Sequence, residues 1–177
     1  MVSLIISLRM KRLVVVLSLV AGSVALTIGG AQAPADARLK RLFPGATTFS
    51  PKGGDPPHFK AYNGEALLGY AFWTTELVPL ERGYSGPIAI LTGLDTKGTI
   101  TGIIVGEHHE PYGDFSIDLP GFAAQFNGKD VRDPFKLGAD IDAVARATIT
   151  MASAVRAVRN SARRVARTFL TPPAPSR

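Results

Sequence analysis

The segment from Asp142 to Thr148, Asp-Ala-Val-Ala-Arg-Ala-Thr, precedes a long helical pattern and carries side chains that can hold a phosphate group. A helix over Ile149 to Phe169 leaves its first N–H groups without internal partners, and the helix dipole adds partial positive charge there. Thr148 supplies a hydroxyl group at this point, and Arg146 supplies a guanidinium group. The pattern therefore predicts a phosphate site. The alternative is an ordinary helix start, with Asp142 as its cap.

His108, His109 and Glu110 are a second group of side chains with a possible chemical role, because histidine and glutamate are common metal ligands. Adjacent residues of a strand point to opposite faces, so the two imidazole rings cannot easily share one ion. The sequence has one other histidine, His58, and no cysteine. We therefore expect no zinc or copper site. No residue pair looks like an acid–base set that would convert a substrate.

The first 33 residues have the pattern of a secretion signal. Three basic residues precede an apolar run from Leu13 to Leu26, and Ala31-Gln32-Ala33 follows as a small-x-small cleavage site. We expect export to the periplasm, with a mature chain that begins at Pro34; Met10 is an alternative start. The other interpretation is an uncleaved membrane anchor, although the run is shorter than the ~20 apolar residues that a spanning helix needs.

Positive charge is concentrated at the C-terminal end of the 177 residues, whose formal net charge is +6. Residues 34–141 hold ten lysines and arginines against thirteen acidic residues, whereas residues 142–177 hold seven arginines and one aspartate. In an exported protein this pattern does not indicate a nucleic-acid partner. The arginine row of the last helix is either a solvated face or a docking surface for an acidic partner or for anionic lipid headgroups.

Residues 34–170 suit one domain that begins with a short helix and continues as strands. The helix is expected over Ala35 to Phe43. A hairpin of His58 to Tyr62 with Glu65 to Thr75 should turn at Asn63-Gly64, as type I′, because both residues tolerate positive φ. A second hairpin pairs Ile88 to Leu94 with Thr99 to Glu107.

The part after the hairpins is expected to be mainly helical. Asp118 is a candidate cap for a short helix that runs to Phe126, and Phe135 to Leu137 is a candidate strand. The last helix has apolar residues spaced by three and four, so one stripe of it should pack on the sheet. Strands followed by a long helix predict an α+β fold, with an antiparallel sheet of hairpins against the C-terminal helix. Residues 171–177 hold three prolines and are expected to be a disordered tail.

The segment Asp142 to Thr148 resembles the flavin-attachment motif of FMN-binding domains, Asp-x-x-Ser/Thr-Gly-Ala-Thr, in which the last threonine carries FMN through a phosphoester bond. Asp142, Ala147 and Thr148 match this motif. Ala145 stands where the motif has a hydroxyl residue, and Arg146 stands where it has glycine. The match is therefore partial.

Other segments extend the resemblance over about residues 36–168. They occur in one order along the chain: Pro44-Gly45-Ala46, Gly64-Glu65 with Gly69-Tyr70, Val78-Pro79, Gly83-Tyr84-Ser85-Gly86, Gly93-Leu94-Asp95 and His108-His109-Glu110-Pro111. Together with the attachment motif they are similar to the periplasmic N-terminal flavin domain of NosR/NirI-type proteins, which are membrane flavoproteins of nitrous oxide respiration. They are more remotely similar to the flavin domains of Rnf G and Nqr C subunits.

The resemblance implies a cofactor site for FMN, covalently bound at Thr148. The residues that it implies for this site are Thr148, Ala147, Arg146, Asp142, Gly83, Tyr84, Ser85, Gly86, His109 and Glu110. The glycines and Tyr84 would line the isoalloxazine ring, and His109 and Glu110 would lie near it. A plain turn at 83–86 and a polar strand end at 108–110 are the alternatives.

The implied function is electron transfer by an exported flavoprotein. The expected partners are a flavin transferase that attaches FMN and redox proteins in the periplasm or membrane. NosR-type proteins continue into membrane helices and cysteine-rich domains, so we expect a free-standing relative with separate electron partners. The competing class is a flavin-free accessory or regulatory protein that binds a respiratory reductase. Ala145 and Arg146 favour that alternative, because they break the attachment motif.

Overall fold

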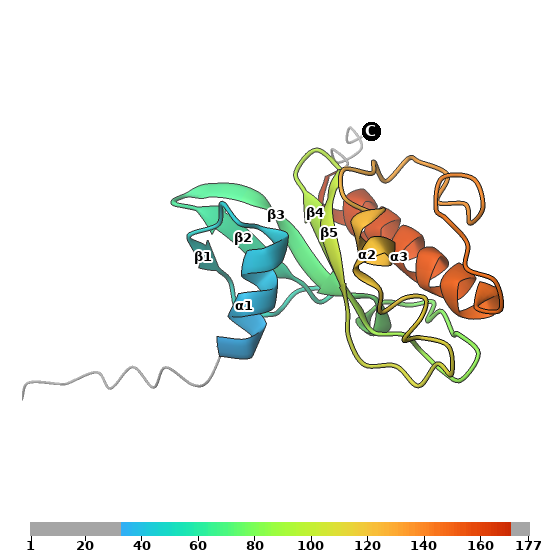
Figure 1. Ribbon diagram of the computed structural model, residues 1–177. Helices are drawn as coiled ribbons and strands as arrows, with labels where there is room; N and C mark the ends of the chain where they lie inside the picture. Colours follow the sequence, from blue (N-terminus) through green and yellow to red (C-terminus); the bar gives the residue numbers. More distant parts are fainter. Residues whose placement is uncertain (1–32, 171–177) are drawn as a thin grey trace, which may run out of the picture. The chain divides into compact units, whose positions relative to one another are not determined.

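The computed structural model describes residues 33–170 (Figure 1). Apart from Ala33, the predicted leader lies outside the described residues, and so does the predicted tail. Within residues 33–170, none of the helices combines the length and the apolar character that crossing a bilayer requires.

A five-stranded antiparallel sheet forms the centre of the fold, and its strands lie in sequence order. The strands are β1 (Thr48–Phe49), β2 (Phe59–Asn63), β3 (Ala66–Trp73), β4 (Ile90–Asp95) and β5 (Ile100–Val105). Hairpins join β2 to β3 and β4 to β5, as predicted. The two-residue strand β1 is too short to leave a periodic pattern in the sequence.

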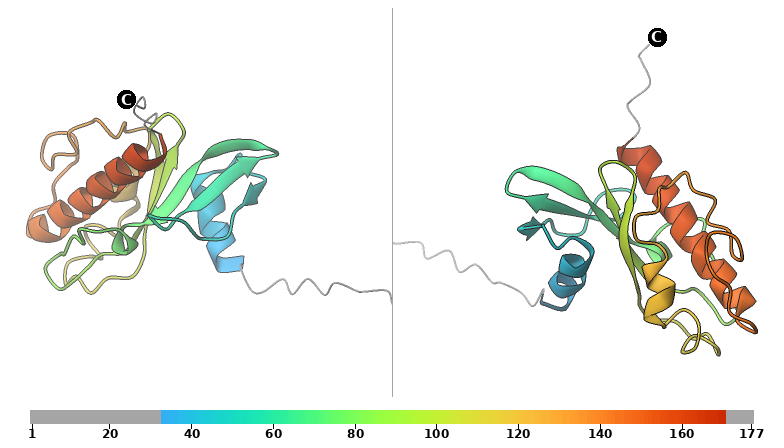
Figure 2. Two further views of the ribbon diagram at one scale, coloured as in Figure 1. Left: turned by 180° about the vertical axis from the view of Figure 1, so that it is seen from behind. Right: turned by 45° about the horizontal axis from the view of Figure 1, so that its top comes forward.

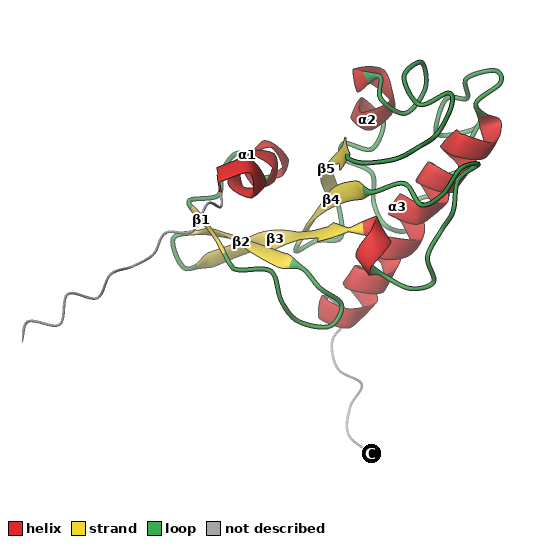
Figure 3. Cartoon of the chain, turned by 90° about the horizontal axis from the view of Figure 1, so that it is seen from below, coloured by secondary structure: helices red, strands yellow, loops and turns green. Residues whose placement is uncertain are grey.

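The helices cover both faces of this sheet (Figures 2 and 3). They are α1 (Ala33–Leu42), α2 (Pro120–Ala124) and α3 (Thr148–Phe169), with a 3₁₀ turn, η1 (Thr74–Glu76), after β3. Along β4, Ile90 and Leu94 pack in the cluster that includes α3, while Leu91 packs in the cluster that includes α1. A strand with two covered faces is apolar on both sides, which explains why β4 shows no polar alternation.

The long helix α3 packs on the sheet through the predicted stripe. Six of its apolar side chains are at most 2% exposed: Met151, Ala154, Val155, Val158, Ala162 and Val165. Arg156 and Arg167 lie off this stripe and are exposed. The predicted α+β fold, with a hairpin sheet packed against the C-terminal helix, is therefore confirmed.

The turn between β2 and β3 differs from the prediction. Asn63 pairs with Ala66, so the two central residues are Gly64 and Glu65, not Asn63 and Gly64. Gly64 has a φ of 58°, whereas Glu65 is not among the residues with positive φ. A type I′ turn requires positive φ at both central positions, so the predicted turn type is wrong.

Two predicted features between β5 and α3 are also wrong. Phe135 has a φ of 50°, which is incompatible with a strand, and Leu137 makes only an isolated bridge to Ile141. Asp118 does not cap α2, because Leu119 occupies the cap position and no side chain bonds there. Asp118 instead binds His108, with 2.9 Å between His108 Nε2 and Asp118 Oδ1. These outcomes depend on tertiary contacts that local sequence does not encode.

Candidate functional site

Thr148 is the first residue of α3, and its side chain is exposed. The preceding residue, Ala147, is buried at the cap position and offers no side-chain oxygen, so no side chain caps this helix. Its first N–H groups are therefore available to an anion, and the helix dipole favours negative charge at this end. The hydroxyl group and the helix terminus lie together, as the sequence predicted.

Asp142 does not cap α3, which corrects the simpler interpretation of this residue. It lies six residues before the helix begins, and its side chain is exposed. Its backbone N–H donates to Gln125 Oε1 at 2.6 Å, which holds the segment before the helix against the residue that follows α2.

Arg146 adopts a left-handed backbone conformation, with a φ of 71°. This is the position at which the attachment motif has glycine, and glycine adopts positive φ without a steric penalty. An L-residue pays roughly 1–2 kcal/mol for this conformation. Arg146 therefore has a backbone conformation that glycine, the residue type of the motif at this position, adopts freely.

We predict that Arg146→Gly stabilises the fold by about 1 kcal/mol, because glycine relieves the strain at this φ. The measurement is the urea unfolding midpoint of the variant against that of the original chain. Arg132→Gly is the control, because Arg132 is exposed and is not among the residues with positive φ. That control should not be stabilised. An Arg146→Gly variant less stable than the original chain would contradict the strain argument.

The turn at Gly83 to Gly86 is fixed by the carboxylate of Glu110. The N–H of Tyr84 donates to Glu110 Oε2 at 3.0 Å, and the N–H of Ser85 donates to Glu110 Oε1 at 2.8 Å. A Cβ atom at Gly83 would collide with the same carboxylate, so only glycine permits this approach. Glu110 itself is 7% exposed.

Glu110 also connects this turn to the first turn of α3. The hydroxyl of Thr150 donates to Glu110 Oε2 at 2.5 Å. Burial by itself raises the pKa of Glu110, but the hydrogen bonds from Thr150, Ser85, Tyr84 and Gly86 outweigh it and lower this pKa below the usual glutamate value. The ionised carboxylate therefore holds the turn at 83–86 beside the helix start that carries Thr148. Sequence reasoning missed Thr150, because its partner is forty residues away.

The two adjacent histidines have different environments. His108 Nδ1 accepts the N–H of Glu110 at 3.2 Å, so Nε2 carries the proton that is donated to Asp118. His109 is exposed. Both histidines follow the end of β5 and lie in a loop, so the expectation that they alternate along a strand is wrong. Across the described part of the chain, no cluster of three or more potential ligand side chains could hold a metal ion.

Large apolar side chains are exposed on the segments that Glu110 joins. Tyr84 is 70% exposed in the turn, Ile149 is 59% exposed beside Thr148, and Tyr112 is 45% exposed two residues after Glu110. The ring of Tyr112 packs against the ring of Phe115, with 5.3 Å between their centroids. We call the three exposed rings of Tyr84, Tyr112 and Phe115 the exposed aromatic surface. Exposed rings on segments held near an anion site suit a planar apolar ligand with a phosphate group.

The comparisons with known proteins agree with this geometry. Residues 83–163 match the family model of the FMN-binding domain. This span starts at the turn that Glu110 fixes, and it includes Thr148. The predicted resemblance to FMN-binding domains is confirmed.

Two groups of curated relatives are distantly homologous to the chain. The G subunit of an ion-translocating oxidoreductase complex from Vibrio vulnificus is 32% identical over 143 residues, covering 72% of this chain and 65% of the relative. The regulatory protein NosR from Stutzerimonas stutzeri is 34% identical over 127 residues, covering 64% of this chain and 17% of the relative. The chain therefore spans less than two thirds of the length of either relative.

Proposed function

We propose that this chain binds FMN and transfers electrons between partner proteins. Its residues 83–163 match the FMN-binding domain. The chain is also distantly homologous to the G subunit of an ion-translocating oxidoreductase and to NosR. The FMN phosphate is held at the start of α3, through a phosphoester bond to Thr148. The observation that carries this proposal is an exposed threonine hydroxyl at an uncapped helix N-terminus, close behind a left-handed residue at the glycine position of the motif.

The side chains and backbone groups around the start of α3 suit the phosphate and the ring system of FMN. The first N–H groups of α3 and the guanidinium group of Arg146 offer donors and positive charge for a phosphate. The exposed aromatic surface offers Tyr84 and its neighbours for contact with a flat ring. Glu110 keeps the turn at 83–86 in place, so this surface is positioned before the cofactor arrives.

The bound flavin would supply the redox chemistry, and the protein would supply attachment, orientation and electrostatic tuning. Glu110 is a positioning residue in this scheme, because its two oxygens are occupied by the backbone of Tyr84 and Ser85 and by Thr150. Tyr84, Thr148 and the guanidinium group of Arg146 are the groups that we assign to direct contact with the cofactor. Asp142 and Arg146 belong to the segment that a flavin transferase would recognise.

The partner class follows from the names of the relatives. One is a subunit of an oxidoreductase complex and another is the regulatory protein NosR, so we propose redox proteins of the periplasm or membrane as electron partners. If the chain acts as NosR-type proteins do, its electron transfer serves nitrous oxide respiration.

The test of the function is the visible spectrum of the purified full-length chain after coexpression with a flavin transferase. A flavin spectrum that bleaches on reduction and returns on oxidation is the expected result. A colourless protein that still binds a respiratory reductase would overturn the proposal in favour of an accessory role.

We also predict export, on the basis of the basic and apolar leader and the Ala-Gln-Ala site. N-terminal sequencing of protein from the periplasmic fraction should give Pro34 as the first residue. An intact Met1 or Met10 in that fraction would count against cleavage. Protein found only in the cytoplasm would remove the proposed periplasmic partners.

A further inference from the structure

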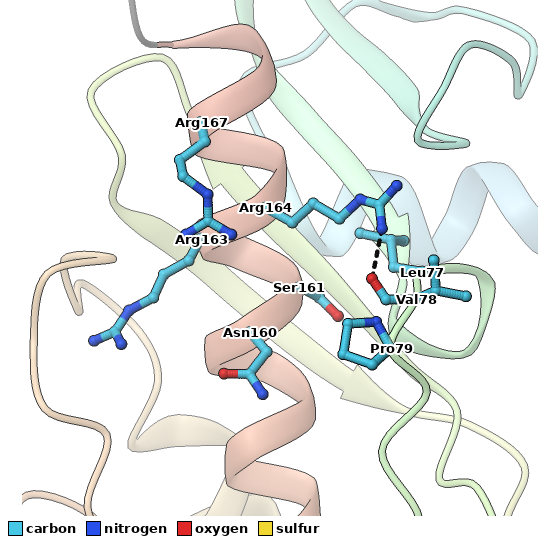
Figure 4. Close-up of a pocket in the computed structure, with 8 residues that line it drawn as sticks. All are labelled: Leu77, Val78, Pro79, Asn160, Ser161, Arg163, Arg164 and Arg167. Carbon is cyan, nitrogen blue, oxygen red and sulfur yellow. Dashed lines mark hydrogen bonds between the residues drawn. The ribbon is translucent and has the colours of Figure 1, made fainter.

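A cavity of about 470 Å³ lies beside the C-terminal half of α3, against the segment that follows η1 (Figure 4). Its helix side carries Arg163, Arg164 and Arg167, and its other side carries Leu77, Val78 and Pro79. The cavity is separate from the proposed flavin site, because the helix between Thr148 and Arg164 is roughly 24 Å long at 1.5 Å per residue. Nothing in the proposed electron transfer uses this cavity.

Of the three arginines at the cavity, only Arg164 lies within 4 Å of a carboxylate among the described residues. Arg164 donates to the carbonyl oxygen of Val78 at 2.5 Å, and Figure 4 shows this side chain reaching across to Val78. The nearest carboxylate to Arg164 is that of Asp55, at 3.8 Å and on a side chain that is 93% exposed. Carbonyl oxygens accept hydrogen bonds but carry no net charge, so they leave the charge of a guanidinium group in place.

The other two arginines of the cavity, unlike Arg164, have no carboxylate partner within residues 37–170. Arg163 points away from Val78 and donates to the carbonyl oxygens of Val131 and Asp133, at 2.8 and 2.7 Å. Neither Arg163 nor Arg167 forms an ion pair within residues 37–170. Arg156, on the same helix, is instead paired with Glu81 at 3.1 Å. The positive field therefore gathers at the C-terminal half of α3, and not along the whole arginine row.

The other side of the cavity is lined by Leu77, Val78 and Pro79. Leu77 is buried, whereas Val78 is 66% exposed. Leu80 does not line the cavity, but it follows Pro79 and is 43% exposed. A soluble phosphate compound without an apolar part gains nothing from contact with exposed aliphatic side chains. A lipid surface offers phosphate groups and an apolar interior together, which matches arginines on one side and aliphatic side chains on the other. These observations favour a lipid over a soluble anion.

We propose that this cavity binds the phosphate group of an anionic phospholipid, with Arg164 and Arg167 at the phosphate and with Val78 and Leu80 against the apolar interior. The contact would hold one end of α3 at a membrane surface. It would leave the helix start at Thr148 facing partner proteins. The inference does not depend on flavin, because none of these residues belongs to the proposed flavin site.

The test is a titration of the full chain with dihexanoylphosphatidylglycerol below the concentration at which it forms micelles. Soluble lipid is used so that the apolar leader does not by itself attach the chain to vesicles. Binding should slow amide hydrogen exchange at Leu77, Val78 and Leu80; Pro79 has no amide hydrogen. Each arginine near an anionic lipid contributes a factor of about five to the affinity. Arg167→Gln should therefore weaken binding roughly fivefold, and the double variant Arg164→Gln/Arg167→Gln roughly thirtyfold.

A matched control removes the same charge elsewhere. Arg41→Gln/Lys136→Gln neutralises two exposed cations away from the cavity and should change the affinity less than twofold. Arg164→Gln removes the hydrogen bond to Val78 and can disturb the segment at 77–80. The single variant Arg167→Gln avoids this problem, because Arg167 makes no side-chain hydrogen bond within the described range.

Four results would overturn the proposal. Equal affinity for dihexanoylphosphatidylcholine would exclude selection for an anionic lipid. Equal protection by inorganic phosphate alone would indicate a soluble anion. Tighter binding of polyglutamate at residues 77–80 would indicate an acidic protein. An equal loss in the control variant would show only general attraction between opposite charges.

Discussion

Replacing Thr148 by valine is expected to abolish covalent FMN completely, since valine has nearly the shape of threonine but lacks the hydroxyl that forms the phosphoester bond. The original chain, coexpressed with a flavin transferase, should remain fluorescent on a denaturing gel and gain the mass of one FMN moiety. A phosphoester bond is independent of the fold, so it survives denaturation. The variant should show neither the fluorescence nor the mass.

A matched control separates this effect from general damage to α3. Thr168→Val makes the same substitution at an exposed position near the other end of the helix, and it should leave the adduct intact. Restoring the motif with Ala145→Ser and Arg146→Gly should raise the fraction of chains that carry flavin. Flavin that is lost on denaturation would indicate a non-covalent site. The absence of flavin in every sample, including the variant with the restored motif, would refute the proposal that the chain is an electron carrier.

Glu110→Gln is expected to lower the free energy of unfolding by about 2 kcal/mol and to release the turn at 83–86. The carboxylate accepts from Tyr84, Ser85 and Thr150 with two oxygens. Glutamine has one acceptor oxygen, and its NH₂ group would face a donor. A buried donor without an acceptor accounts for the loss of stability. Urea unfolding measures the free energy, and hydrogen exchange at residues 84–86 measures the release of the turn.

Glu107→Gln is the control for this prediction, because Glu107 is exposed and lies three residues earlier. It should change stability by less than about 0.5 kcal/mol, as surface substitutions usually do. Thr150→Val removes one donor and completes a double-mutant cycle with Glu110→Gln, which isolates the contact between the helix and the turn. Unchanged exchange at 84–86 in Glu110→Gln would show that the turn holds without the carboxylate.

The pH dependence of stability gives a second test of Glu110. Its folded-state pKa is lowered, so ionisation contributes stability that is present above the usual glutamate pKa and is lost as pH falls through the folded value. The stability difference between the original chain and Glu110→Gln should therefore be constant at neutral pH. It should shrink from roughly pH 4.3 downward, which pH-dependent urea unfolding can follow.

The sequence by itself determined the two hairpins, the first and last helices and the α+β class. Apolar spacing by three and four located α3 within one residue of its start, because a helix that packs on a sheet needs one continuous apolar stripe. The apolar runs around 95–98 located the second hairpin. The segment at 142–148 pointed to the FMN-binding domain, whose family model matches residues 83–163. These signals are local, so neighbouring residues are enough to reveal them.

Tertiary structure decided how the site is held together. Glu110 was expected near the flavin, and the structure shows it bonded to the turn at 83–86 and to Thr150 on α3, contacts that span 25 to 40 residues of sequence. Arg146 was a departure from the motif in the sequence, but its φ of 71° is a backbone conformation that glycine adopts freely. Hydrogen-bond partners and backbone angles depend on which segments meet in three dimensions, and a local pattern of residue types does not contain that information.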